Sequence, residues 1–319
     1  MTRIGFHASH EQISPRQLLR DVQHAERAGF QMAICSDHFS PWSRRQGHSG
    51  FAWSWLGAAL ATTELSFGCV TAPGQRTHPA VLAQKIATLG QMFPGRFWAA
   101  LGSGQNLNEH ITGDKWPLKT DRIARLEECV TVIRRLLDGE EVTQDGYVTV
   151  DRARVWESAD PIPQLIGPAV SVESAERVAA WADGFVTLNQ PIPKLREMLD
   201  AYRGAGGTGR TSLQIHLSWA DTDEEAEGIA HEQWRSNVFD EPVNWDTATP
   251  EAFDLMAEHV QPGAMHEDVR ISSDPSRHAE WIAEYAELGF DDIYLHHVGQ
   301  DQGPFINRFA DEVLPRVAG

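Results

Sequence analysis

An acid, an imidazole and an indole stand close together in the chain, as Asp37, His38 and Trp42. They follow residues 32–35, an apolar run with the length of a buried strand. Ligands of parallel α/β folds bind at the carboxyl ends of the strands, so we expect these side chains to face a ligand. An imidazole can exchange a proton near neutral pH, which makes His38 the candidate general acid or base.

Other polar, glycine-rich segments follow other predicted strands. Residues 102–108 come directly after the strand predicted at 97–101, and their glycines would let a planar ligand approach the backbone. Residues 69–79 follow the preceding strand, and Arg76 within them is either a surface charge or a group that reaches a cofactor tail. Residues 167–170 open a predicted helix, where free N–H groups and the helix dipole predict a phosphate-binding site.

The order of the predicted elements explains why these segments should meet. The strand candidates are 3–8, 32–35, 66–70, 97–101, 164–166, 185–188, 213–219 and 292–296. The helices predicted between and after them are 15–28, 52–62, 78–93, 120–137, 172–182, 192–202, 223–235, 276–288 and 304–316. Eight such units predict an α/β fold, a (β/α)8 TIM barrel over residues 1–319 as a single domain, rather than an open doubly wound sheet.

Two stretches interrupt this alternation and predict insertions at the carboxyl-terminal face. Residues 139–160 contain Asp145-Gly146 between β-rich runs, which is typical of a hairpin. Residues 236–272 lack a strong period, and a segment of that length in a compact domain is typical of a lid or an irregular substrate-side insertion. At the end of the last strand, His296 and His297 should point in opposite directions, one into the barrel and one outward.

Composition restricts the partners and the compartment. The chain has 27 Lys and Arg against 45 Asp and Glu, a net charge of −18, which disfavours nucleic acid and anionic membranes as partners. No apolar run approaches the ~20 residues of a membrane span, and the first residues lead straight into a predicted strand instead of a signal peptide. Cys35, Cys69 and Cys129 are odd in number and widely spaced, so we expect buried free thiols in a cytoplasmic protein.

Several of these motifs together resemble the bacterial luciferase-like superfamily. Within it, they are similar to the branch of deazaflavin (F420)-dependent glucose-6-phosphate dehydrogenases. The shared segments are Ser36-Asp37-His38-Phe39, Pro41-Trp42, Gln46-Gly47-His48, Ser54-Trp55, His78-Pro79-Ala80-Val81, Gly102-Ser103-Gly104, Leu107-Asn108-Glu109 and Trp116-Pro117. The resemblance implies a flavin- or F420-dependent oxidoreductase that holds an isoalloxazine-type ring at the carboxyl end of the barrel.

The resemblance also implies roles for particular residues. It makes His38 the proton acceptor or donor, makes Trp42 a wall that stabilises the reacting geometry, and places Gln105 at the ring. The cofactor-binding residues that it implies are Asp37, Cys69, Val70, Ala72, Ser103, Asn108, Ile166, Gly167, Ala169 and Val170. A non-prolyl cis peptide behind the ring would join Cys69 to Val70.

Some positions depart from the pattern of this branch. Gln105 stands where the branch has a glutamate thought to protonate the deazaflavin, and Ala72 replaces a threonine near the ring. Pro191 and Asp268 stand where a lysine and an arginine hold the sugar phosphate, so glucose 6-phosphate is not the expected substrate. We therefore predict a member that has reverted to ordinary flavin and uses FMN for hydride transfer or monooxygenation of a small neutral or apolar molecule. F420-dependent hydride transfer is the alternative.

Two hypotheses from other classes remain. A barrel that has lost catalysis and binds a flavin as carrier or sensor would account for Gln105. A metal-dependent hydrolase comes last, because His38, His296 and His297 have no clear carboxylate bridge, and no metal site is predicted. Beyond a small-molecule substrate, the resemblance allows a homodimer, although no segment of the sequence identifies an interface.

Overall fold

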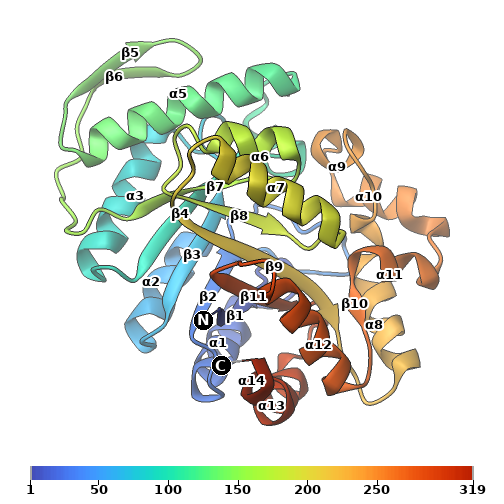
Figure 1. Ribbon diagram of the computed structural model, residues 1–319. Helices are drawn as coiled ribbons and strands as arrows, with labels where there is room; N and C mark the ends of the chain where they lie inside the picture. The colour runs from blue at the N-terminus through green and yellow to red at the C-terminus, as the bar shows by residue number, and fades with distance from the viewer. Residues whose placement is uncertain (1, 318–319) are drawn as a thin grey trace.

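Eight parallel strands form a closed barrel in the computed structural model, which describes residues 2–317 (Figure 1). The strands are β1 (Arg3–Ala8), β2 (Met32–Ser36), β3 (Ser66–Thr71), β4 (Phe97–Leu101), β7 (Gln164–Pro168), β8 (Gly184–Leu188), β9 (Arg210–Ser218) and β11 (Asp292–His297). Each pairs with the next in this order, and β11 pairs with β1 to close the ring. The predicted TIM barrel is confirmed, with strand bounds within a few residues of those expected.

Helices surround the barrel. They are α1 (Pro15–Arg27), α2 (Ala52–Thr62), α3 (Pro79–Met92), α4 (Asn106–Glu109), α5 (Lys119–Leu137), α6 (Val172–Val178), α7 (Ile192–Gly204), α8 (Asp223–Trp234), α12 (Pro275–Ala286), α13 (Gln302–Glu312) and α14 (Leu314–Val317). In α1, Pro15 takes the first turn, and Leu18, Val22 and Ala25 face the barrel at helical spacing. The segment predicted as one helix at 304–316 is divided into α13 and α14.

Side chains alternate between the inside of the barrel and the surrounding helices. Met32, Ile34 and Tyr294 belong to a buried cluster inside the barrel, whereas Cys35 and Leu213 pack with the helices. At the amino end, Arg3 Nε lies 2.8 Å from Asp292 Oδ1, and Arg210 Nη2 lies 2.7 Å from the same oxygen. The barrel is therefore filled by side chains, and its carboxyl end is the face on which polar residues can meet a ligand.

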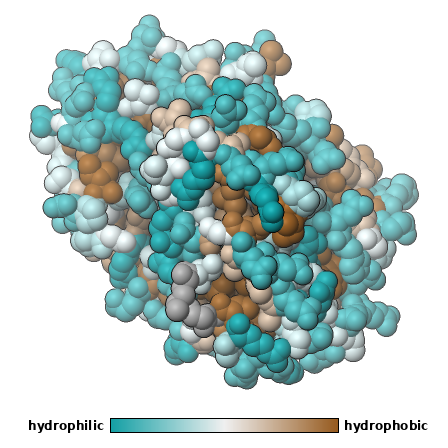
Figure 2. Space-filling view, in the orientation of Figure 1, coloured by the Kyte–Doolittle hydropathy of each residue, from teal (hydrophilic) through white to brown (hydrophobic). Residues whose placement is uncertain are grey.

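Both predicted insertions are present. β5 (Val142–Asp145) and β6 (Thr149–Ala153) form the expected antiparallel hairpin, which lies against α5 in Figure 1. Within 236–272 the chain forms α9 (Val243–Asp246), α10 (Pro250–Met256), α11 (Met265–Asp268) and the short strand β10 (Arg270–Ile271) beside β9. Most of the surface shown in Figure 2 is hydrophilic, as the high charge of the chain requires.

The three cysteines are buried and free, as expected. The cis peptide expected between Cys69 and Val70 is wrong, because cis bonds in residues 2–317 occur only before Pro161 and Pro242. Both residues of that pair lie in regular register with β2 and with β4, and a trans backbone serves both ladders. Between residues 2 and 317, none of the helices combines the length and the apolarity that a membrane span requires.

Candidate functional site

His38 and Glu11 form a pair at the carboxyl end of the barrel, on the loops after β2 and β1. His38 Nδ1 lies 3.0 Å from Glu11 Oε1, and the two side chains are 14% and 6% exposed. Burial alone would raise the pKa of Glu11, but its attraction to His38 and their hydrogen bond prevail and lower that pKa to about 2. Because the Glu11 carboxylate pairs with Nδ1 of His38, the other ring nitrogen, Nε2, is the one that can exchange a proton with a substrate.

Trp42 lies beside this pair and is supported by the insertion. Its ring centroid is 5.6 Å from that of His38 and 5.4 Å from that of Phe253 in α10. Asp254, the residue after Phe253 in α10, accepts a hydrogen bond from Ser43 at 2.6 Å and lies 3.1 Å from Nε of Arg44. The structure thus brings Trp42 and His38 together, and α10 fixes the loop that carries them.

The Asp37 side chain points into the protein. It is 3% exposed and accepts hydrogen bonds from Trp53 Nε1 at 3.0 Å and Thr71 Oγ1 at 2.9 Å. Burial opposes its charge, but the Arg76 guanidinium and these two hydrogen bonds hold its pKa below the ordinary value. The structure therefore places Asp37 beneath the mouth of the barrel, not on its surface, where a ring contact was predicted.

Arg76 connects three consecutive loops of the site. Its Nη2 donates to the Asp37 carbonyl at 2.7 Å and lies 3.3 Å from Asp37 Oδ2. Its backbone N–H donates to Glu109 Oε2 at 2.6 Å, and its Nε lies 3.6 Å from Oε1. Burial raises the pKa of Glu109, although Arg76 opposes this change. Arg76 is thus an internal ion-pair residue, with its side chain only 10% exposed.

Asn108 also fixes the loop that carries His38. Its side-chain oxygen accepts the backbone N–H groups of Phe39 at 2.8 Å and Ser40 at 3.3 Å, and its Nδ2 lies 3.4 Å from Gln105 Oε1. Asn108 is 4% exposed, whereas Ser103 and Gln105 are partly exposed. The amide of Gln105 is therefore the more available of the two amides to a ligand.

Gly102 leaves space at the exit of β4. A Cβ atom at this position would meet Pro168 at 3.7 Å and the Thr71 carbonyl at 3.8 Å, which are ordinary contacts. No neighbour in the described chain therefore requires glycine here, and the missing side chain leaves room for a flat ring against the backbone. Val70 packs against the inner barrel cluster and is partly exposed. Ala72 is also partly exposed, and its Cβ lies 3.5 Å from where a Cβ at Gly104 would be.

Other predicted cofactor residues are less available. Cys69 packs toward the helices, and Ile166 lies inside the barrel. In the predicted phosphate cradle, the Ala169 N–H is already used, because it donates to the Val186 carbonyl at 3.0 Å. A Cβ at Gly167 would meet Val178, and phosphate binding by the Gly167 backbone stays a prediction. Ser171 and Ser174 cap the short helix α6 reciprocally. Phosphate binding by the Val170 backbone stays a prediction.

Three neutral histidines, His7, His216 and His296, lie inside the barrel at its carboxyl end, and of these the sequence had indicated only His296. The ring centroids of His7 and His296 are 4.1 Å apart, and His216 lies 4.5 Å from Trp234. His296 Nε2 hydrogen-bonds Gln12 Oε1 at 2.8 Å. Residues 7–12 leave the first strand as a polar run, the same signal that identified Asp37 and His38. A search for polar residues after the first predicted strand would therefore have found both His7 and Glu11.

These histidines should make the fold sensitive to acid. Burial lowers the pKa of His7 to about 4 and that of His216 to about 3, from an ordinary value of 6.5. Between pH 6.5 and these values the unfolded chain binds more protons, so the free energy of unfolding falls as the pH falls. A tenfold difference in proton affinity between the folded and the unfolded chain corresponds to about 1.4 kcal/mol. Urea unfolding at several pH values should show a decrease of several kcal/mol between pH 7 and 4.

A substitution can show whether His7 causes part of this dependence of the free energy of unfolding on pH. His7→Asn should reduce it, because one group that is neutral in the fold no longer titrates. His259→Asn, at an exposed position, should leave it unchanged. Equal slopes in the wild type and His7→Asn would contradict the assignment.

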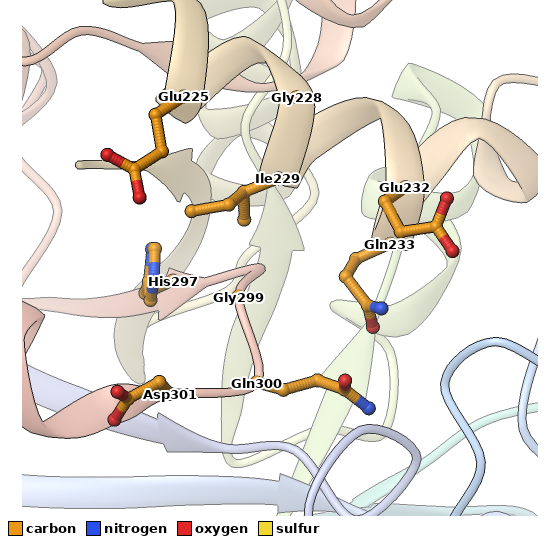
Figure 3. A pocket seen from close by; sticks show the side chains of 9 residues that line it. All are labelled: Glu225, Gly228, Ile229, Glu232, Gln233, His297, Gly299, Gln300 and Asp301. Atoms are coloured by element: carbon orange, nitrogen blue, oxygen red, sulfur yellow. The ribbon is translucent and has the colours of Figure 1, made fainter. Parts of the chain in front are cut away.

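His297 points outward from the barrel, as the alternation predicted. Its ring stacks on Phe305 with centroids 5.0 Å apart, whereas His296 faces inward. Outside the barrel, His297 borders a cavity of about 470 Å³ between α8 and the loop after β11 (Figure 3). Neither His38 nor Glu11 lines this cavity, so it is separate from the site at the mouth.

The fold and the relatives of the chain together define a TIM-barrel oxidoreductase. The chain belongs to the luciferase-like monooxygenase family, whose profile matches residues 1–292. It is 35% identical to an F420-dependent glucose-6-phosphate dehydrogenase from Beutenbergia cavernae, over 99% of its own length and 98% of the relative's. The resemblance drawn from the motifs is therefore confirmed.

Solved structures show the same fold. An F420-dependent secondary alcohol dehydrogenase, in complex with an F420-acetone adduct, is 28% identical with a TM-score of 0.91 over 99% of both chains. The oxygenating constituent of 3,6-diketocamphane monooxygenase from Pseudomonas putida, in complex with FMN, is 16% identical with a TM-score of 0.69 over 99% of both chains. The second likeness concerns the fold alone.

Proposed function

We propose that this chain is an F420-dependent dehydrogenase or reductase that moves a hydride between F420 and a small neutral alcohol or ketone. The observation that carries the proposal is the His38–Glu11 pair, which opens on the mouth beside neutral histidines. A base beside uncharged hydrogen-bonding groups suits a hydroxyl or carbonyl group. The substrate-side positions Pro191 and Asp268 supply no cation, which disfavours a phosphorylated substrate.

The cofactor preference differs from the one drawn from the sequence. FMN was favoured because Gln105 cannot donate a proton as a glutamate would. The relatives at 35% and 28% identity are named for F420, whereas the FMN complex is a neighbour of 16% identity. We therefore take F420 as the cofactor and keep FMN, with monooxygenation, as the alternative.

The residues at the mouth fit a flat heteroaromatic ring. The open space at Gly102 would receive it, with Val70 and Ala72 against its face and the Gln105 amide as a hydrogen-bonding partner. When bound, F420 supplies the position that accepts or returns a hydride. His38 Nε2 would take the proton of the substrate hydroxyl, Glu11 would stabilise the resulting imidazolium, and Trp42 would exclude water from one side.

Cofactor binding tests the proposal. The purified protein should bind F420 and then reduce it when propan-2-ol is added, as followed by the visible absorbance of the oxidised deazaflavin. Under the same conditions FMN should bind at least about tenfold more weakly, a difference of about 1.4 kcal/mol. Tight FMN binding without F420 binding would contradict the proposal and support FMN as the cofactor.

The non-catalytic barrel predicts a different result. A carrier or sensor would bind the cofactor without turnover by the wild type, whatever alcohol or ketone is supplied. Turnover that depends on His38 would exclude it.

A further inference from the structure

The cavity between α8 and the loop after β11 has the size of a small-molecule site. Its volume is about 470 Å³, within the range of about 300–1,000 Å³ that such sites occupy. The residues that line it come from α8 and from 297–301, as Figure 3 shows. Gly228 of α8 contributes to the space, because a Cβ at this position would extend into the open. The cavity can therefore accept an organic molecule.

Two carboxylates that line the cavity have no cation as a partner. Glu225 and Asp301 form no ion pair in the part of the chain that the structure describes, whereas Glu232 does. The Glu232 Oε1 atom lies 3.9 Å from Arg45 Nε. In the view of Figure 3, the Glu225 and Asp301 side chains lie above and below His297. Their uncompensated charge favours a cation in the cavity.

The wall of the cavity also holds a buried imidazole with one nitrogen unused. His297 is 3% exposed, and burial lowers its pKa to about 3, so it adds no positive charge. Its Nδ1 accepts the backbone N–H of Trp219 at 3.4 Å, which places the ring hydrogen on Nε2. Nε2 lies against Gly299 in the lining, and no hydrogen bond within residues 2–317 uses it. A ligand with a hydrogen-bond acceptor would satisfy this buried N–H.

Hydrogen bonds fix the side of the cavity that faces the barrel. Gln233 and Gln300 line the cavity. The Gln300 amide donates to the carbonyl of Gln12 at 3.1 Å and to that of Gln46 at 2.9 Å. The Gln46 amide donates in turn to the Gln233 carbonyl at 3.1 Å. A wall that is already ordered loses little conformational freedom when a ligand binds.

We propose that this cavity binds a small amino alcohol, a molecule that carries both an ammonium group and a hydroxyl group. The ammonium group pairs with Glu225 and Asp301, and the hydroxyl oxygen accepts the Nε2–H of His297. Ile229 offers an apolar contact to the carbon chain between the two groups. Within the described residues, no three Asp, Glu, His or Cys side chains are placed to hold a metal ion, which favours an organic cation.

Isothermal titration calorimetry with three linear probes tests the proposal. Aminobutanol, with its two groups at opposite ends, should bind to the purified protein. Butylamine lacks the hydroxyl group and butanediol lacks the charge, so each should bind at least about tenfold more weakly. A folded wild type that does not bind aminobutanol, or that binds the three probes equally, would overturn the proposal. Displacement of aminobutanol by an equal concentration of Mg²⁺ would overturn it in favour of a metal site.

Substitutions locate the binding in this cavity. Glu225→Gln and Asp301→Asn should each weaken aminobutanol binding by about tenfold or more, because each removes one negative charge and keeps the size of the side chain. The asparagine retains an oxygen for the Gly303 N–H, which Asp301 caps at 3.2 Å, so α13 should stay folded.

Two further variants complete the test. Glu224→Gln is the matched control, since Glu224 is an exposed neighbour in the same turn of α8 and does not line the cavity. It should leave binding unchanged. Gly228→Leu should fill the cavity and abolish binding, with the helical circular dichroism of the wild type. Binding that survives Glu225→Gln, Asp301→Asn and Gly228→Leu, or that Glu224→Gln weakens equally, would overturn the proposal.

Discussion

His38→Ala is expected to lower turnover by about 10²- to 10⁴-fold, the usual contribution of a positioned acid or base. The side chain lies at the mouth, and in the wild type its attraction and hydrogen bond to Glu11 hold the pKa of that carboxylate at about 2 against burial. F420 affinity should stay near that of the wild type, because the ring is assigned to the side of Gly102 and Gln105. Steady-state kinetics with propan-2-ol and a separate F420 binding titration measure the two quantities.

Two comparisons separate chemistry from structure. His48→Ala removes an exposed imidazole from the same loop and should keep wild-type turnover. Glu11→Gln should lower kcat, since the positive charge that forms on His38 when it takes the substrate proton has lost its carboxylate partner. An unchanged kcat in His38→Ala would exclude the proposed proton transfer.

Arg76→Met should destabilise the fold by about 3–5 kcal/mol, because it leaves buried carboxylates without their cation. Asp37 and Glu109 are 3% and 1% exposed, and both face the Arg76 guanidinium. Urea unfolding measures the change in the free energy of unfolding. Turnover should fall as well, since the three loops of the site lose their common partner.

A double substitution tests whether the loss comes from this network. Asp37→Asn combined with Arg76→Met should cost less than the sum of the two single changes. Arg277→Met breaks an exposed pair with Glu280 and should cost less than about 1 kcal/mol. If Arg76→Met lowers the free energy of unfolding no more than Arg277→Met does, the ion pairs of Arg76 with Asp37 and Glu109 contribute little to stability.

The barrel could be predicted because its signals are local. The barrel strands after the first are short apolar runs separated by helices with buried residues at regular spacing, and Gly29 and Gly289 adopt positive φ just after α1 and α12. The strand bounds at 3–8 and 97–101 were matched fully. Closure into a barrel then followed from the number of βα repeats.

The site was only partly predictable, because side-chain pairing across loops is not a local property. His38 was found from its place after a strand, but its distance to Glu11 depends on the stagger of β1 and β2. Asp37 and Asn108 were expected to contact the ring of a cofactor. In the structure, the Asp37 side chain accepts a hydrogen bond from Trp53, and the Asn108 side chain accepts one from the backbone of Phe39. The Ala169 amide was counted as free because its strand partner Val186 lies on a separate segment.

The contact between Trp42 and α10 has a consequence for how the range of substrates can change. Phe253 and Asp254 belong to a segment that supplies no strand to the closed ring, yet they set where the indole stands. Lengthening or shortening that segment would widen or narrow the entrance while the ring of strands kept its shape. Diversification of the molecules that such enzymes accept can thus proceed by loop exchange, independently of the machinery for proton transfer.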